Sequence, residues 1–138
     1  MIRKDYLMRQ FEEFGKFLGI VFALKNDRNW KEIETVIKNS SKKFTSVEIN
    51  EVEKLNDADL LSHLIETHHL KDDQLKMLGD LLYEKGISLA HQFNESASNN
   101  SLKKSLLVFT WLKSNSLEID FSLDMHFKIN SLKQMLAN

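Results

Sequence analysis

The chain has no cysteine and no proline, and only four of its 138 residues are glycine. The absence of cysteine excludes a disulfide framework, a thiolate metal site and a cysteine nucleophile. Because proline breaks helix interiors, a chain without it can run from helix to helix with few interruptions. No apolar run approaches the roughly 20 residues that cross a bilayer. These absences favour an all-α protein without a membrane span, located in the cytoplasm.

The composition is that of one globular domain. Hydrophobic residues make up 42% of the chain and charged residues 28%, values that argue against disorder. A chain of this length buries enough surface to fold without disulfides or a structural metal. We therefore expect a single helical domain over residues 1–138.

Charge is unevenly distributed, although the net charge is only −1. Residues 1–44 carry ten basic against six acidic side chains, whereas residues 45–80 carry three against nine. These charges can be solvated helix faces, or the basic section can meet the acidic one, within one chain or across two. The basic residues are interleaved with acidic ones and form no dense cluster, which argues against nucleic acid as a partner.

The N-terminal segment predicts a strongly apolar helix over residues 3–24. Apolar side chains recur there at alternating spacings of four and three residues, the pattern of one helix face; they are Leu7, Phe11, Phe14, Leu18 and Val21. Tyr6, Phe17 and Phe22 widen this face. A helix so apolar needs to be covered, so we expect it either in the core or in a dimer interface.

The whole chain predicts antiparallel helical hairpins, with about six to seven helices in all. We assign the first hairpin to residues 3–44 and an insertion of short helices to residues 45–71. The second hairpin and a C-terminal helix occupy residues 72–138. No segment shows the alternation of a strand, so the fold class is all-α.

Polar residues mark the expected helix ends and loops. Asn29 followed by Glu32 has the pattern of a helix N-cap with its capping-box partner, and Thr45 with Glu48 repeats that pattern. The run of Ser, Ala and Asn at residues 96–101 predicts a loop.

All four glycines fall inside predicted helices, where each costs about 1 kcal/mol relative to alanine. Gly15 and Gly19 lie one turn apart, and Gly79 and Gly86 lie two turns apart. We expect each pair to mark a groove where another helix approaches closely.

The second hairpin resembles the tetratricopeptide (TPR) pattern of small residues at helix crossings. Gly86 is similar to the small residue of the first repeat helix, and Ser105 and Phe109 to the small and aromatic positions of the second. The separation of Gly86 and Ser105 exceeds that of a standard repeat by about two helical turns. The first hairpin has a similar stretch in its second helix, at Trp30, Ile33 and Ile37. The resemblance implies a TPR-like array of hairpins.

Both ends of the chain also resemble an uncharacterised bacterial family of helical proteins, a domain of unknown function. The similar segments are residues 1–9 at the start and residues 120–123 and 126–129 near the end. The resemblance spans nearly the whole chain and is closest at these ends. It implies a helical fold and a bacterial cytosol, and it implies no catalytic residue.

Five histidines invite the hypothesis of a metal site. His63, His68 and His69 cluster, and Glu66 forms a single Glu-x-x-His motif with His69. A carboxylate-bridged dimetal bundle needs two such motifs, and a zinc protease needs His-Glu-x-x-His; the sequence has neither. The sequence therefore predicts no metal and no cofactor.

The motifs of common enzymes are also missing. Phosphate-binding loops need glycines outside helices, and a hydrolase serine needs a Gly-x-Ser-x-Gly elbow. The expected loops are few and short, whereas catalytic residues concentrate on loops. We therefore expect that the protein is not an enzyme.

A mixed polar and aromatic group near the N-terminus is the candidate interface, since Tyr and Arg are enriched where proteins meet. Its members are Lys4, Asp5, Tyr6, Met8, Arg9 and Phe14. The same residues could simply complete the core. The sequence predicts a protein–protein interaction or self-association module that binds a peptide, a helix or a second copy of itself. The alternative is a small-molecule sensor or enzyme with a pocket between helices and His69, His91 or His126 at its mouth.

Overall fold

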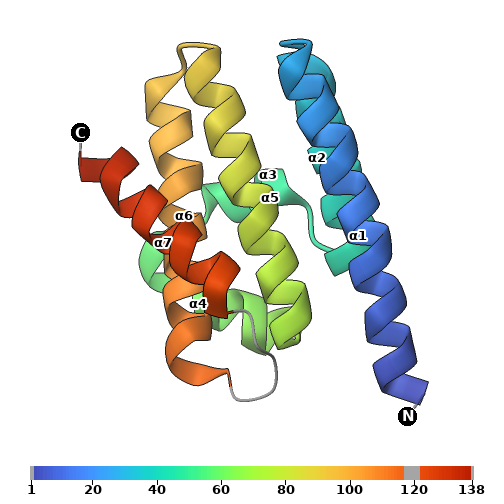
Figure 1. Ribbon diagram of the computed structural model, residues 1–138. Helices are drawn as coiled ribbons and strands as arrows, with labels where there is room; N and C mark the ends of the chain where they lie inside the picture. The colour runs from blue at the N-terminus through green and yellow to red at the C-terminus, as the bar shows by residue number, and fades with distance from the viewer. Residues whose placement is uncertain (1, 117–121, 138) are drawn as a thin grey trace.

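All regular structure in the described part of the chain is helical, as the sequence predicts. The computed structural model describes residues 2–116 and 122–137. Within these ranges there are seven α-helices and no strand (Figure 1). The helices are α1 (Ile2–Asn26), α2 (Trp30–Thr45), α3 (Ile49–Lys54), α4 (Leu60–Ser62), α5 (Asp72–His91), α6 (Glu95–Asn115) and α7 (Ser122–Ala137). A 3₁₀ turn over Asp57–Asp59 precedes α4, and a π-helical turn over His63–Thr67 follows it.

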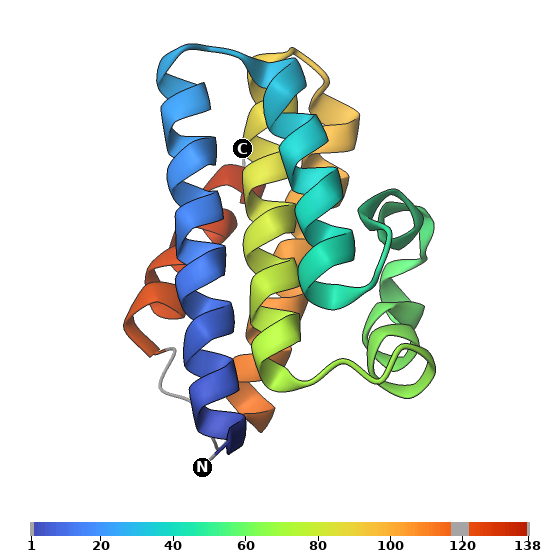
Figure 2. The same cartoon turned by 90° about the vertical axis from the view of Figure 1, so that its right-hand side faces the viewer.

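Helix α5 lies at the centre, and the other helices cover it. It packs most extensively on α6 and next on α2. Helices α1 and α2 form a hairpin on one side of α5, and α7 lies against α6 on the other side (Figures 1 and 2). The segment that carries α3 and α4 lies beside α2 and α6 (Figure 2). Because α5 has neighbours on every face, residues 75–84 are all buried.

One of the two predicted helix caps is present. The side-chain oxygen of Asn29 accepts a hydrogen bond from the backbone N–H of Glu32 at 3.4 Å, at the start of α2. The capping box predicted for Thr45 and Glu48 is wrong. Thr45 ends α2, where its hydroxyl donates to the carbonyl of Ser41 at 2.6 Å, and Glu48 makes no side-chain cap at the start of α3.

The loop predicted at residues 96–101 is also wrong, because these residues lie in the first turns of α6. The helix begins directly after Asn94, whose side-chain oxygen accepts a hydrogen bond from the N–H of Ala97 at 3.4 Å. The small polar residues that suggested a loop serve helix packing instead. Ser98 is buried, and its hydroxyl donates to the carbonyl of Gly86 in α5 at 2.7 Å.

Helices α5 and α6 approach closely because two glycines of α5 face α6. A Cβ atom added to Gly79 would lie 2.5 Å from the ring of Phe109, and one added to Gly86 would overlap Leu102. The hydroxyl of Ser105 donates to the carbonyl of Gly79 at 2.8 Å. This confirms the close packing predicted for the second glycine pair. In the TPR resemblance, Ser105 and Phe109 of the second helix belong with Gly86 of the first. In the structure, both residues contact Gly79 instead, which lies about two turns before Gly86.

Aromatic rings close the core between α1 and α2. The rings of Phe14 and Phe44 meet edge to face, with centroids 5.3 Å apart and planes at 89°. Phe17 lies beside both rings. Phe14 is only 4% exposed, so this member of the candidate interface is part of the core.

Candidate functional site

The six residues of the candidate interface do not form one surface. Residues two apart on a helix point in nearly opposite directions, and Tyr6 and Met8 are therefore exposed on different sides of α1. Asp5 and Arg9 are exposed, and the side chain of Lys4 lies outside the described residues. With Phe14 in the core, the group divides between the interior and two flanks of the helix.

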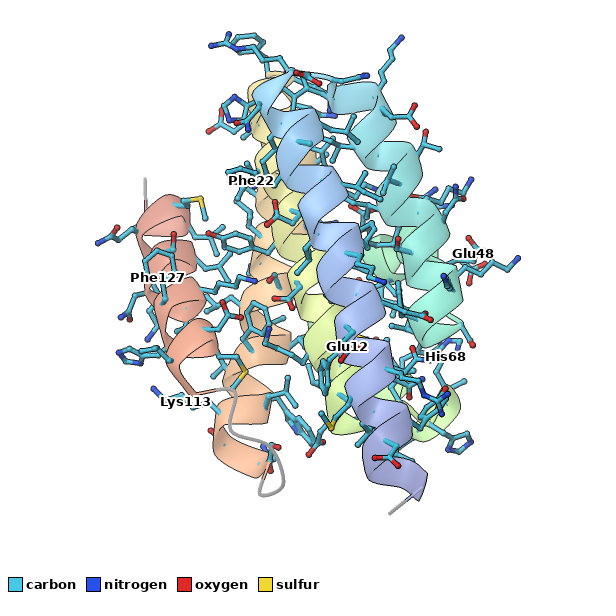
Figure 3. The ribbon with its side chains drawn as sticks, turned by 45° about the vertical axis from the view of Figure 1, so that its right-hand side comes forward. Glu12, Phe22, Glu48, His68, Lys113 and Phe127 are labelled. Carbon is cyan, nitrogen blue, oxygen red and sulfur yellow. The ribbon has the colours of Figure 1, made fainter. Side chains whose placement is uncertain are left out.

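A different set of α1 residues forms a continuous exposed strip, which we call the glycine stripe. Its members recur at spacings of four and three residues and are Met8, Glu12, Gly15, Gly19 and Phe22. Met8 is 54% exposed and Phe22 is 64% exposed. A Cβ atom added to Gly15 or Gly19 would have no atom within 4 Å. Glu12 and Phe22 lie on the side of α1 that faces away from α2 (Figure 3).

The expectation that both glycine pairs mark close helix contacts therefore holds for one pair within this chain. Gly79 and Gly86 are covered by α6, whereas the described residues leave Gly15 and Gly19 uncovered. The spacing of the four glycines in the sequence does not distinguish the covered pair from the uncovered pair. A glycine that faces a neighbouring helix and one that faces solvent have the same sequence pattern.

Tyr6 lies at a small cavity rather than on the glycine stripe. The cavity has a volume of about 160 Å³ and lies where α1, the end of α2 and the start of α5 meet. Its polar lining includes Gln10, Gln74 and the carboxylate of Asp73, which is 6% exposed. Drug-sized ligands bind in cavities of about 300–1,000 Å³, so this one is small for such a ligand.

Larger hollows lie among exposed residues. One of about 530 Å³ is lined by Lys38, Lys42 and their neighbours on α2, and one of about 470 Å³ lies between α1 and α2. His126 lines a third, of about 270 Å³, beside the exposed Leu123 of α7. His91 is stacked on Trp30, with ring centroids 4.4 Å apart.

Buried lysines attach the α3–α4 segment to the central helices, a feature that the sequence argument missed. Lys104 of α6 is 2% exposed and donates to Asp57 at 2.8 Å. The hydrogen bond from Lys104 lowers the pKa of the Asp57 carboxyl and outweighs the effect of burial. Lys85 of α5 pairs with Glu53, which also accepts from Ser101 at 2.5 Å. The signal was present, since Lys104 shares one face of α6 with small and apolar residues.

These pairs show where the acidic section has its basic partners within the chain. The acidic section pairs through partly buried contacts with Lys85 and Lys104, which follow it in the chain. The basic first section contributes an exposed pair, Lys42 with Glu48 at 3.5 Å. Within the described residues, the alternative that the first section meets the acidic one is therefore represented by this surface pair, a kind of contact that contributes little to stability. Pairing of the two sections across two chains stays a prediction.

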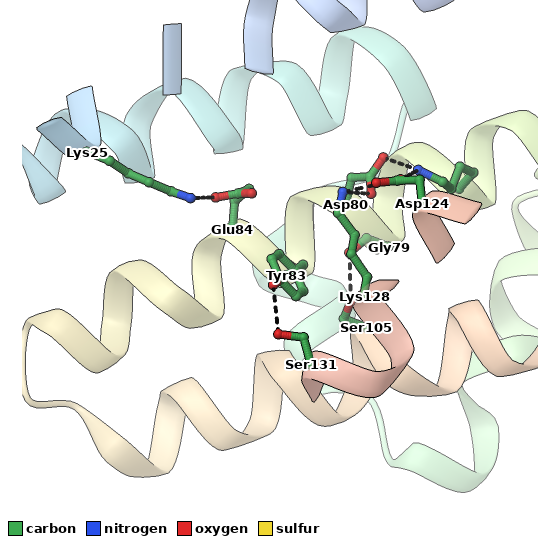
Figure 4. A network of polar contacts seen from close by, with 10 residues as sticks. Lys25, Gly79, Asp80, Tyr83, Glu84, Ser105, Asp124, Lys128 and Ser131 are labelled. Atoms are coloured by element: carbon green, nitrogen blue, oxygen red, sulfur yellow. Dashed lines mark hydrogen bonds and ion pairs between the residues drawn. The ribbon is translucent and has the colours of Figure 1, made fainter. Parts of the chain in front are cut away.

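A second ionic cluster holds α7 against α5 (Figure 4). Asp80 of α5 accepts from Lys76 at 2.7 Å and from Lys128 of α7 at 2.6 Å, and Asp124 of α7 accepts from Lys76 at 2.8 Å. Burial is the largest single influence on the pKa of Asp124 and raises it, but the hydrogen bonds and charges of Lys76 and Lys128 together lower this pKa overall. Burial is likewise the largest influence on the pKa of Lys128 and lowers it, but Asp80, Asp124 and Glu84 together raise this pKa overall.

The π-helical turn after α4 brings two histidine rings together. The Nε2 atoms of His63 and His68 are 3.2 Å apart, and the rings stand at 72° to each other. In the sequence, His63, His68 and His69 form one cluster, and the motif recognised there joins Glu66 to His69, so the direct contact of His63 with His68 was not predicted. His69 is exposed and has a φ of 56°, a left-handed conformation that ends the turn.

Within residues 2–116 and 122–137, no group of three or more His, Asp or Glu side chains is arranged to hold a metal ion. None of the described helices is both long and apolar enough to cross a membrane. No family model, curated protein or solved structure matches this chain. Any assignment of function therefore depends on the chain's own surfaces.

Proposed function

We propose that the protein is a helical interaction module and that its contact surface is the glycine stripe of α1. The observation that carries the proposal is the pair of uncovered glycines between two exposed apolar side chains, Met8 and Phe22. Each glycine weakens its helix by about 1 kcal/mol relative to alanine. Among the residues that the structure describes, no packing contact offsets that loss at Gly15 and Gly19. A helix of a partner that crosses there would offset it.

The simplest partner is a second copy of the chain. In an antiparallel pair of α1 helices that cross at Gly15, residues at equal distances on either side of Gly15 meet. Phe22 and Met8 are each seven residues from Gly15, so the ring of one copy would meet the thioether of the other. Sulfur–aromatic contacts of this kind are favourable. The two-fold arrangement would use the same surface on both copies.

We also propose that the hairpins are TPR-like and that the protein is located in a bacterial cytoplasm. A TPR-like α5–α6 hairpin is supported by the close packing of the two helices at Gly79 and Gly86, although Ser105 and Phe109 contact Gly79 rather than Gly86. A cytoplasmic location is supported by a chain without cysteine, and a bacterial source only by the resemblance at the chain's two ends. The small-molecule alternative has weaker support, because the cavity at Tyr6 is small and the larger hollows are lined mainly by exposed residues.

Light scattering coupled to size exclusion tests self-association over a range of protein concentrations. The wild-type chain should shift from monomer to dimer as its concentration rises. The double variant Gly15→Leu/Gly19→Leu should stay monomeric, because leucine side chains would hold the two helices apart. A Cβ atom at either position meets no atom of the described residues within 4 Å, and both positions are exposed, so folding should be retained. Thr110→Leu, at an exposed position of α6, is the matched control and should dimerise as the wild type does.

The absence of native cysteine allows a direct test of the antiparallel register. A Met8→Cys/Phe22→Cys variant should form an intermolecular disulfide under mild oxidation, because the two positions meet across the pair. Met8→Cys alone should not, since the two copies of residue 8 would be about 21 Å apart at 1.5 Å per residue. A wild-type chain that remains monomeric at every concentration would overturn the self-association proposal.

A further inference from the structure

The close pair of histidine rings in the π-helical turn follows from the local backbone. In a π-helix the backbone bond joins residues five apart, and the N–H of His68 donates to the carbonyl of His63 at 3.1 Å. This bond places one histidine directly above the other. Their Nε2 atoms are 3.2 Å apart and their ring centroids 4.8 Å apart.

We propose that His63 and His68 bind one divalent transition-metal ion through these two Nε2 atoms. Bonds of about 2.0–2.1 Å that meet at the tetrahedral angle put two nitrogen ligands about 3.3–3.4 Å apart. The observed separation of 3.2 Å is within a few tenths of an ångström of that value. The distance between the two nitrogens therefore suits one ion, and the rings need to turn until both Nε2 lone pairs point at it.

Binding requires a change of tautomer. In the pair, one Nε2 atom carries the hydrogen that lies between the rings, and the other offers its lone pair. A metal ion needs both Nε2 lone pairs, so the donating histidine moves its proton from Nε2 to Nδ1. Two nitrogen–metal bonds form and two water molecules leave the ion, with no net release of protons.

The chemistry of the site indicates which ions it takes. Imidazole nitrogens suit Cu²⁺, Ni²⁺ and Zn²⁺, and among these Cu²⁺ binds most tightly to a given set of ligands. The described residues supply two ligands, so water completes the coordination.

Titration calorimetry of the full chain with CuCl₂ and with ZnCl₂ tests the proposal. We expect one ion per chain, tighter binding of Cu²⁺ than of Zn²⁺, and at least a tenfold loss of affinity in His63→Ala and in His68→Ala. His69→Ala is the matched control, since His69 is adjacent in sequence but exposed, and it should bind as the wild type does. An equal loss in His69→Ala, or no loss in either paired variant, would overturn the proposal.

Electron paramagnetic resonance of the Cu²⁺ complex provides a readout that does not depend on the variants' folding. The wild-type spectrum should show coupling to two imidazole nitrogens, and His68→Gln should reduce it to one. Circular dichroism of each variant establishes whether the helices are retained. A wild-type spectrum without imidazole coupling contradicts the proposal, whatever the variants do.

Discussion

Helices α5 and α1 are both long and each contains two glycines, yet their surroundings differ. Helix α5 has neighbours on every face, and side chains of α6 fill the space over Gly79 and Gly86. Helix α1 is covered on one side, and the space over Gly15 and Gly19 is open. In α5 the missing side chains allow a close helix crossing. In α1 glycine weakens the helix in the same way, and no contact from residues 2–116 or 122–137 compensates for the loss.

The covered and the exposed side of α1 should differ most in the effect of replacing a phenylalanine on each. Phe14→Ala should lower the free energy of unfolding by about 3–5 kcal/mol, because the ring is buried against Phe44. Phe22→Ala should change it by about 0.5 kcal/mol or less, because that ring is mostly exposed. Urea denaturation followed by circular dichroism measures both. Similar losses for the two variants would mean that α1 does not pack through its Phe14 face.

The covered glycines of α5 should not tolerate a side chain. In Gly79→Ala the new Cβ atom would press on the ring of Phe109, and overpacking of this kind costs about 1–3 kcal/mol. This loss should exceed the gain in helix propensity, so the melting temperature should fall. Phe109→Leu in the same background removes the obstructing ring and should recover part of the loss. A stabilised Gly79→Ala variant would contradict the close α5–α6 crossing.

The uncovered glycines of α1 should respond with the opposite sign. Gly15→Ala should raise the free energy of unfolding by about 0.5–1 kcal/mol, because alanine favours the helix and meets no neighbour. Chemical denaturation at low protein concentration, where the chain is monomeric, isolates this effect. Destabilisation at that concentration would show that some part of the chain covers Gly15.

The smallest expected effect concerns the charges that hold α7 to α5. The folded-state pKa of Asp124 lies below its ordinary value of 3.8, so its pairing stabilises the fold above that value. The contribution is lost as the pH falls through the lowered pKa. Asp124→Asn should therefore be less stable than the wild type at pH 7, and the difference should shrink in acid. Urea denaturation at several pH values measures it, and a difference that grows in acid would contradict the sign.

The sequence predicted the long helices well, because helix formation there depends on residues only a few positions apart. Alternating spacings of three and four, without proline to interrupt them, specify the long helices, and Asn29 marks the start of α2. Residues 96–101 misled the prediction because small polar residues occur both in loops and at close helix crossings. The contact of Ser98 with Gly86 joins two helices, so a pattern of neighbouring residues in the sequence does not predict it.

The candidate interface was predicted less well than the fold. Composition near the N-terminus grouped Tyr6, Met8 and Phe14, but helix geometry separates them into a cavity, an exposed stripe and the core. The pairing of His63 with His68 depends on a π-helical turn, whose spacing of five residues was not predicted from the sequence.

The sequence by itself determined the fold class, because helix propensity and apolar spacing act within a few residues of one another. Only the tertiary structure decided which glycines are covered, which lysines are buried and which histidines meet. Those outcomes depend on contacts between residues far apart in the chain, or on an irregular turn held by its surroundings. The open side of α1 is likewise a property of the assembled helices, since covered and uncovered glycines share the same local pattern.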